Sequence, residues 1–427
     1  TAQWPIGLGI NSLGTCIVVV AFMNYRMQIC QSIGEIAQAE WNSLVRKCNG
    51  GVLHPALRHE YLLALESSGS ATAETGWGPL HLAIHDDSNA LLAAMPLYLK
   101  SHSYGEYVFD WAWAQAYEKN GLRYYPKLLC AIPFTPVLAP KVLHANSEAA
   151  SAMANGLAQL TWQAAENKEL LGTRISTLHA LFLTEQDQQL ILGNATSLNN
   201  SSRHVVQFHW HNQSPARNEP FCDFDDFLES LNQKKRKNIR AERRKAKVEG
   251  LEIRRIEGSK ATQAELEFFY QCYSRTYMEH FSSPYLNPEF FKQICTTMGE
   301  QVLIIQASLN GVPVASSFFL YSEERLYGRY WGCVENLPCL HFELCYYQAI
   351  EFAIEHGIEW FEGGAQGEHK MARGLNPQTM VSAHYVHDEG FKLPIENFLR
   401  REKAHLQAYA IELNEHTAFR SSTLLEP

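Results

Sequence analysis

The stretch LYGRYWGCVENLPCLHFELCYYQAIEFAIEHGIEWFEGGAQGEHKMARG, residues 326–374, decides the fold of this chain. Its first part, Leu326–Gly332, is aromatic and favours a strand. Phe342–His356 is dense in helix formers and is followed by a glycine, the residue expected just past a helix end. Ile358–Glu362 is short and apolar, and it opens into the glycine-rich turn Gly363–Arg373. The order strand, helix, strand predicts a βαβ unit with parallel strands and a right-handed crossover.

The carboxyl ends of these two strands are the expected place for chemistry, because ligands of open α/β sheets bind beyond that edge. Glycines there allow backbone N–H groups to approach a ligand closely. Glu368 or His369 could accept a proton, and Lys370 or Arg373 could hold an anion. The alternative is a tight turn whose charges face water. The candidate substrate contacts at this edge are Tyr330, Trp331, Gln366, Glu368 and Arg373.

Three further charged residues belong to the same unit. Arg329 alternates with Tyr327 and Trp331 along its strand, which is typical of a buried pair or a ligand contact. Glu343 begins the helix, where the helix dipole favours a carboxylate, so it is either a first-turn acid or a catalytic group. Glu362 ends the second strand and is a candidate substrate contact.

The rest of the chain predicts two α/β domains, residues 29–195 and 203–427, with a polar, turn-rich boundary near Gly193–Ser202. Residues 1–28 are expected to be a poorly informative extension, because their apolar run Ile6–Phe22 is short and interrupted for a membrane helix. The alternative is a weak membrane or export signal. In the first domain the patterns predict helices over residues 32–48, 57–66 and 149–166, and strands over 80–84, 90–99 and 174–183. In the second they predict strands over 205–211 and 251–256, helices over 225–248, 263–280, 288–298 and 394–413, and a hairpin turning at Asn310–Gly311.

Composition excludes several classes of protein. The chain has 427 residues, enough for two or three domains, and its net charge of −9 gives no overall attraction to nucleic acid. Its ten cysteines are scattered, which suits reduced thiols in a cytosolic protein. His209 and His211 flank Trp210, but no third ligand is nearby, so we expect no metal site.

The basic stretch KKRKNIRAERRKAK, residues 234–247, is a second candidate site. Its residues Arg236, Arg240 and Arg243 share one helix face, and Asn238 lies among them. Such a face suits phosphate groups, and it repels itself unless a partner is present. The alternative is a solvated helix face.

A third cluster lies in the first half of the chain. Lys100, His102, Tyr104, Glu106 and Asp110 fall within eleven positions, interleaved with aromatic residues. They are candidates for a substrate-binding wall, although Asp110 would equally suit a hydrogen-bonded core acid. Lys127, in the nearby stretch RYYPKLLC, is a further candidate substrate contact.

Several of these stretches together resemble the FemAB-like proteins of the GNAT acyltransferase superfamily. They are QKKRKNIRAERRKAKVEGLEI, the hairpin and βαβ unit from VLIIQASLNGVPV to GGAQGEHKMARG, and PLYLKSHSYGEYVFDWAWA with YYPKLLCAIPFTPV. The likeness runs from Ile29 to Leu413 and points to a bacterial branch. It implies two tandem GNAT-like modules, each a mixed sheet flanked by helices. Relatives end the strand-end turn in G-x-x-x-Y-K, whereas here His369 replaces the tyrosine and Lys370 is retained.

The resemblance also implies an activity, the transfer of an acyl or aminoacyl group to an amine acceptor, with a place in peptidoglycan precursor metabolism. Glu343, His369 and Lys370 are the expected catalytic residues. The donor is either acyl-CoA or an aminoacyl-tRNA, and no tightly bound cofactor or metal is expected. The glycines with which GNAT enzymes hold pyrophosphate are missing from CVENLPCLHF, residues 333–342, which puts acetyl-CoA binding in doubt. We expect a cytoplasmic protein. The alternative function is a non-catalytic module that binds RNA or another polyanion through the basic helix.

Overall fold

The fold is divided into two compact units. The computed structural model describes residues 6–10, 16–22, 25–167, 171–193, 201–365, 367–415 and 417–420. Unit 1 comprises Thr1–Val205 and Met380–Leu406, and unit 2 comprises Val206–Thr379 and Gln407–Pro427. The predicted division near Gly193–Ser202 is therefore close to the observed one. The predicted second domain has to be corrected, because residues 380–406 pair and pack with unit 1.

Unit 2 is built on a mixed sheet whose strands follow the order β12-β13-β14-β15-β16-β11. The hairpin of β13 (Val302–Leu309) and β14 (Val312–Tyr321) turns at Asn310–Gly311, as predicted, with positive φ at both residues. β15 (Arg325–Cys333) is antiparallel to β14 and parallel to β16 (Trp360–Ala365). The outer strands are β12 (Leu251–Glu257) and β11 (Ser201–His211). The predicted βαβ unit is confirmed.

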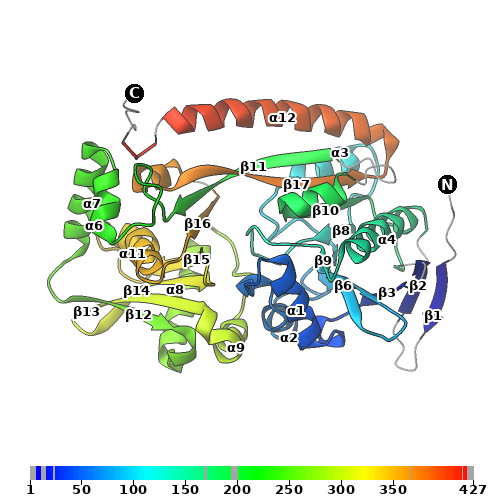
Figure 1. Ribbon diagram of the computed structural model, residues 1–427, viewed down its shortest axis with the longest axis horizontal. Helices are drawn as coiled ribbons and strands as arrows, with labels where there is room; N and C mark the ends of the chain where they lie inside the picture. The colour runs from blue at the N-terminus through cyan, green and yellow to red at the C-terminus, as the bar shows by residue number, and fades with distance from the viewer. Residues whose placement is uncertain are drawn as a thin grey trace. The chain divides into compact units, whose positions relative to one another are not determined.

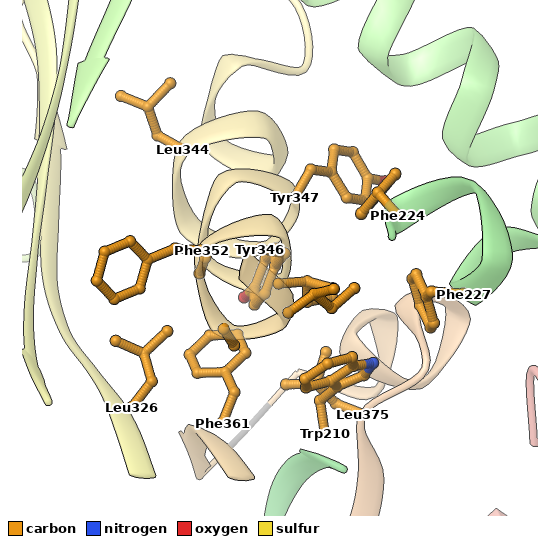
Figure 2. Packing of buried hydrophobic residues seen from close by; sticks show 14 of the residues in the cluster. Trp210, Phe224, Phe227, Leu326, Leu344, Tyr346, Tyr347, Phe352, Phe361 and Leu375 are labelled. Carbon is orange, nitrogen blue, oxygen red and sulfur yellow. The ribbon is translucent and has the colours of Figure 1, made fainter. Parts of the chain in front are cut away.

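Helices cover both faces of this sheet (Figure 1). On one face lies the crossover segment, which consists of α10 (Leu340–Phe342), a π-helical turn (Glu343–Tyr347) and α11 (Gln348–Glu355). α6 (Phe224–Ser230) and α7 (Gln233–Ala246) pack beside it, so the single helix expected over residues 225–248 is two. Figure 2 shows Tyr347 reaching from the crossover toward Phe224, while Leu326 and Phe361 project from the parallel strands into the same core. α8 (Gln263–Glu279) and α9 (Pro288–Met298) cover the other face.

Unit 1 contains two groups of strands. The first follows the order β1-β2-β3-β5-β6-β9, and the second follows β17-β10-β8-β7-β4. β10 (Thr177–Leu183) is parallel to β8 (Lys127–Cys130) and antiparallel to β17 (Asn376–Val386). The other strands are β1 (Ile6–Ile10), β2 (Cys16–Phe22), β3 (Tyr25–Cys30), β4 (Trp77–Pro79), β5 (His81–His85), β6 (Leu91–Met95), β7 (Tyr98–Lys100) and β9 (Leu143–His144).

The helices of unit 1 are α1 (Gln38–Cys48), α2 (His59–Ser67), α3 (Trp111–Lys119), α4 (Ser147–Glu166), α5 (Glu185–Ile191) and the unit 1 part of α12 (Glu389–Glu415). The long helix α4 buries a small-residue face against β5, β6 and β10. The prediction of mixed sheets flanked by helices is thus confirmed in both units. Pairing of β3 with β5 means that residues 25–28 belong to the sheet and not to an extension. Among the described residues, no helix is long and apolar enough to cross a membrane.

Candidate functional site

The parallel strands β15 and β16 pair only at their first residues. Their register runs from Arg325 opposite Trp360 to Tyr327 opposite Glu362 and then stops, although β15 continues to Cys333. In the described part of the chain, β15 is paired beyond this point only on its β14 side. The carboxyl ends of the two strands therefore part at the edge where the sequence predicts chemistry.

A glycine bulge bends the end of β16 away from β15. Gly363 and Gly364 stand opposite the single residue Phe208 of β11, because Gln207 pairs with Ala365 and His209 with Glu362. A Cβ atom on Gly363 would lie 2.4 Å from Leu375 Cδ2, and Gly364 has a φ of +78°. Both positions thus favour glycine. The predicted close approach of their backbone N–H groups to a ligand stays a prediction.

Lys370 stabilises the bent end of β16. Its Nζ donates to the carbonyl oxygens of Gly363 at 2.7 Å, Gly364 at 3.3 Å and Ala365 at 3.0 Å. The side chain is buried, and burial lowers the pKa of Lys370 to about 8. All three N–H groups of the ammonium are used by the strand, so Lys370 shapes the site and has no donor left for a substrate.

His369 lies next to Lys370 and remains exposed. Its Nε2 is 3.2 Å from the hydroxyl of Tyr346, and its ring packs 5.9 Å from Phe342 and 6.4 Å from His341, measured between ring centroids. Burial, Arg373 and Lys370 all lower the pKa of His369, so its imidazole is neutral at pH 7. A neutral imidazole can accept a proton at the nitrogen that does not contact Tyr346.

A cavity of about 140 Å³ lies beside His341 and Phe342, in the loop that follows β15. Trp331 closes it at the strand end, with its ring 5.1 Å from that of His341, and residues 335–340 form the remaining wall. Among the residues that the structure describes, no lysine or arginine lines this cavity. This loop falls within residues 333–342, the segment in which the glycines of a pyrophosphate-binding turn are missing.

Arg373 is buried and bridges the turn to α7. It donates to the carbonyl oxygen of His369 at 2.6 Å and to Glu242 at 2.8 Å, and its guanidinium lies 3.5 Å from the ring centre of Phe342. The hydroxyl of Tyr347 donates to the same Glu242 carboxylate. Arg373 therefore fixes the backbone of His369, instead of presenting a free cation to an anionic substrate as predicted.

Glu343 is fully buried in the π-helical turn. Arg243 donates to both of its oxygens, at 2.9 and 3.1 Å, and Gln348 donates to one of them at 2.8 Å. A catalytic base has to exchange protons with the substrate, and a carboxylate covered by a guanidinium cannot do so in this conformation. The structure gives Glu343 a structural ion pair, contrary to its predicted role as a base.

The basic helix α7 also differs from its prediction. Arg243 faces the core and pairs with Glu351 at 2.6 Å as well as with Glu343. Arg236 lies 3.4 Å from Glu229, and Arg240 lies 3.4 Å from Asp225, while Asn238 is exposed. The helix face thus has carboxylate partners within its own unit, which removes the argument that it needs an external anion.

The remaining predicted contacts of unit 2 lie around the strand gap. Arg329 donates to the Tyr330 hydroxyl at 3.3 Å, and the Tyr330 ring packs 4.9 Å from Tyr273 of α8. Glu362 is buried and pairs with Arg325 at 3.0 Å. Glu368 is exposed and accepts from Tyr409 at 2.8 Å. Gln366 lies outside the described residues.

In unit 1, Lys127 is the centre of a buried charged cluster. Its Nζ donates to Ser103 Oγ at 2.8 Å, to Glu106 Oε2 at 2.8 Å, and to Asp110 Oδ2. Burial and the neighbouring Asp110 raise the pKa of Glu106 to about 7, although Lys127 opposes the shift. Burial alone would raise the pKa of Asp110, but the Lys127 ammonium outweighs it and holds that pKa far below its ordinary value. One cation between two carboxylates can fully neutralise only one of them.

Lys100 lies close to this cluster, and no carboxylate in the described ranges pairs with it. Its ammonium is 3.7 Å from the ring centre of Trp77, and it donates to His102 Nδ1 and to the carbonyl oxygen of Tyr104, both at 3.3 Å. Burial lowers the pKa of Lys100 to about 7. Tyr104 itself is 55% exposed. The structure therefore brings Lys100, Glu106, Asp110 and Lys127 together, with His102 and Tyr104 at the rim.

Sequence reasoning missed the other members of this cluster. The Tyr124 hydroxyl donates to Asp110 at 2.6 Å and lies 3.1 Å from His179 Nε2, and His179 Nδ1 is 2.5 Å from His384 Nδ1. Burial lowers the pKa of His179 to about 3, so this imidazole is neutral. The tyrosine precedes β8, and the two histidines lie on β10 and β17. No spacing along the chain could have revealed them.

His209 and His211 have different contacts. His209 is buried and its Nε2 is 3.2 Å from Gln207 Oε1, whereas the His211 ring stacks on Trp360 with 4.0 Å between centroids. Within the described ranges, no group of three or more His, Cys, Asp or Glu residues is arranged to hold a metal ion.

Comparisons with known proteins give a family. A family model named FemAB-like, described as peptidoglycan biosynthesis/recognition, matches residues 32–421. A solved structure of FemX is 11% identical, with 84% of this chain and 98% of that chain covered and a TM-score of 0.49. A tandem GNAT protein from the clavulanic acid biosynthesis pathway is 9% identical, with 85% and 99% covered and a TM-score of 0.43. L-PGS from Bacillus licheniformis is 12% identical, with 80% and 96% covered and a TM-score of 0.44. A comparison with curated proteins gave no match.

Proposed function

Because the chain belongs to the FemAB-like family of peptidoglycan biosynthesis/recognition proteins, we propose that it is an N-acyltransferase acting on an amine acceptor. The family predicted from the sequence is confirmed by the match over residues 32–421. The proposed reaction transfers an acyl or aminoacyl group within peptidoglycan precursor metabolism. The observation that carries the proposal is the parting of β15 and β16 beyond Tyr327 and Glu362. His369 is linked to the end of β15 through His341, whose ring contacts both His369 and Trp331.

In the proposed reaction the acceptor nitrogen attacks the donor carbonyl carbon at the strand gap. A new C–N bond forms, and the bond from that carbon to the thioester sulfur or ester oxygen of the donor breaks. Backbone N–H groups of β15 beyond Tyr327 are the proposed donors to the oxyanion of the tetrahedral intermediate. The departing sulfur or oxygen takes up a proton, so the step is a simple acyl exchange.

His369 is the proposed base that removes the proton from the acceptor ammonium. Its neutral imidazole accepts at Nδ1 when Nε2–H donates to the Tyr346 oxygen, 3.2 Å away. Lys370 and Arg373 are proposed as positioning residues, because one fastens the strand end and the other holds the His369 carbonyl. We propose acyl-CoA or an aminoacyl-tRNA as donor, both of which are cytoplasmic metabolites. The missing pyrophosphate turn and the cationless cavity favour the aminoacyl ester.

The experiment that tests this function supplies purified full-length protein with either donor, labelled in the acyl group, and a peptidoglycan precursor that carries a free amine. Mass spectrometry of the acceptor should show one added acyl group. His369→Gln should lower the rate by about 100-fold, the usual contribution of a general base. His356→Gln replaces an exposed histidine of the same unit and should leave the rate unchanged.

Two results would contradict the proposal. No transfer from either donor to any amine would remove the activity itself. If His369→Gln and Lys370→Met both transferred the acyl group at the full rate, the activity would stand, but the strand gap would not be its site.

A further inference from the structure

An open hollow of about 520 Å³ lies within unit 1, at the amino-terminal ends of β8 and β10. Its walls come from the turn after α3, the end of α4, the residues that lead into β10, and the join between β17 and α12. This volume lies within the usual range for small-molecule sites. The proposed transfer does not use this hollow.

Two arginines line the hollow, Arg123 on one wall and Arg174 on another, and both are exposed. In the described part of the chain, neither guanidinium takes part in a hydrogen bond or an ion pair. This sets them apart from Arg203, which pairs with Glu402 in the same unit at 2.8 Å. Two exposed guanidinium groups on the walls of one hollow can each attract an anion that enters it.

The acidic residues of the hollow already have partners in the protein. Glu166 lies 3.4 Å from His387 Nε2, and Asp388 Oδ1 accepts from the backbone N–H of Gly390 at 2.8 Å at the start of α12. Their charges reduce the positive potential of the hollow. Among the described charged groups of the hollow, the guanidiniums of Arg123 and Arg174 are therefore the ones whose N–H donors are unused.

The floor of the hollow is held in place by the buried cluster of unit 1. The hydroxyl of Tyr125, which lines the hollow, lies 2.8 Å from Ser103 Oγ, and that oxygen accepts from Lys127 at 2.8 Å. Elsewhere in the lining, the backbone N–H of His387 donates to the backbone carbonyl oxygen of Ser176 at 3.1 Å. A fixed floor and wall lower the entropic cost of ordering a ligand there.

We propose that this hollow binds the oxyanion group, phosphate or carboxylate, of a small molecule through Arg123 and Arg174. A guanidinium presents a planar pair of N–H donors that matches either group, and two guanidiniums can hold one oxyanion from two sides. The bound molecule extends over Tyr125, which also lines the hollow.

Isothermal titration of the full-length protein with inorganic pyrophosphate, and separately with succinate, tests the proposal and distinguishes the two anion types. At least one of them should bind saturably and more weakly as salt is added, because salt screens the attraction. Arg123→Gln and Arg174→Gln should each weaken binding by about tenfold or more, the usual effect of losing a charged hydrogen bond. Arg123→Lys keeps the charge without the fork and should fall between these values.

Arg46→Gln is the matched control, because Arg46 is an exposed arginine of unit 1 that does not line the hollow. Its binding curve should equal that of the unmodified protein, and thermal unfolding should show that all variants fold. The proposal is overturned if neither anion binds saturably. It is equally overturned if the variant with both arginines replaced binds as tightly as the control.

Discussion

Two buried lysines, Lys127 and Lys370, show how neighbours set the behaviour of one residue type. Lys127 contacts two carboxylates, and these raise its pKa although burial alone would lower it. Lys370 contacts three backbone carbonyls, which carry only partial charges, so burial prevails and lowers its pKa to about 8. The first lysine is therefore a permanent cation, and the second titrates near neutral pH.

This difference predicts how the proposed transfer depends on pH. Below its pKa of about 8, Lys370 is an ammonium with three donors for the strand end, and above that pKa it loses one donor and its charge. The rate at saturating substrate should therefore fall as the pH rises through about 8. On the acidic side of the same profile, the rate rises as His369 loses its proton. This rise should be complete below pH 7, because the pKa of His369 is lowered.

Lys370→Arg separates this explanation from a loss of protein stability. Its guanidinium stays charged at every pH of the assay, so the variant should be slower but should lose the fall near pH 8. The measurement is the rate at saturating substrate from about pH 6 to about pH 10. If the rate of Lys370→Arg also fell near pH 8, the fall would belong to a group other than Lys370.

Glu106 predicts a second pH effect, on stability. Its folded pKa of about 7 lies above the ordinary value of 4.5, so the folded protein binds this proton more tightly than the unfolded chain. Stability from this group is present below about 4.5 and is lost as the pH rises to about 7. The loss is on the order of 3–4 kcal/mol, since each pKa unit corresponds to about 1.4 kcal/mol.

Glu106→Gln should remove that loss, because an amide of the same shape has no proton to release. The free energy of unfolding, measured with denaturant at several pH values, should become flatter across this window than in the unmodified protein. Glu118→Gln, at an exposed position of α3, should keep the original slope. Equal slopes in all three proteins would mean that Glu106 is ionised throughout.

Helix α7 shows how one element combines two kinds of arginine. Arg243 is partly covered and links Glu343 and Glu351, whereas Arg236 and Arg240 lie opposite exposed acids of α6. Arg243→Leu should destabilise the protein by about 3–5 kcal/mol, because it leaves a buried carboxylate unpaired. Arg236→Leu and Arg240→Leu should each cost less than about 1 kcal/mol. Denaturant unfolding of the three variants checks this, and equal losses would contradict it.

The sequence predicted those elements whose signals lie within one stretch. The βαβ unit, the Asn310–Gly311 hairpin and the strand-end turn with Lys370 each depend on neighbours in the chain. β17 was missed, because its pairing of Ala383 with Ala180 joins residues some two hundred positions apart and its own pattern is broken by Pro377. α3 was missed because its start, WAWA, is as aromatic as a strand.

The candidate site, too, was predicted only where its residues are neighbours in the chain. The residues of the glycine turn were found together because they are consecutive. The partners that decide their roles were not, since Arg243 meets Glu343 across a hundred positions and Glu242 meets Arg373 across more. A charge run on one helix says nothing about the acids that fold beside it.

At the scale of the whole molecule, the chain does not divide at a single point. It leaves unit 1 within β11, returns to it within β17, and leaves again within α12. Residues 380–406 supply unit 1 with a strand that pairs with β10 and with His384, which contacts His179. Unit 1 is therefore complete only with a segment that the chain makes nearly two hundred residues later.

This arrangement predicts the behaviour of fragments. Residues 1–205 alone lack the β17 partner of β10 and leave the buried cluster around His179 open to water, so they should not unfold cooperatively. Residues 1–205 joined through a flexible linker to residues 380–406 should recover a cooperative transition in thermal unfolding followed by circular dichroism. Co-expression of residues 1–205 with residues 206–427 should also recover a complex that elutes as one species, since the missing strand is then supplied by the second fragment. If residues 1–205 alone unfolded at the same temperature as the linked form, β17 would contribute nothing to unit 1, and the chain would consist of two consecutive domains after all.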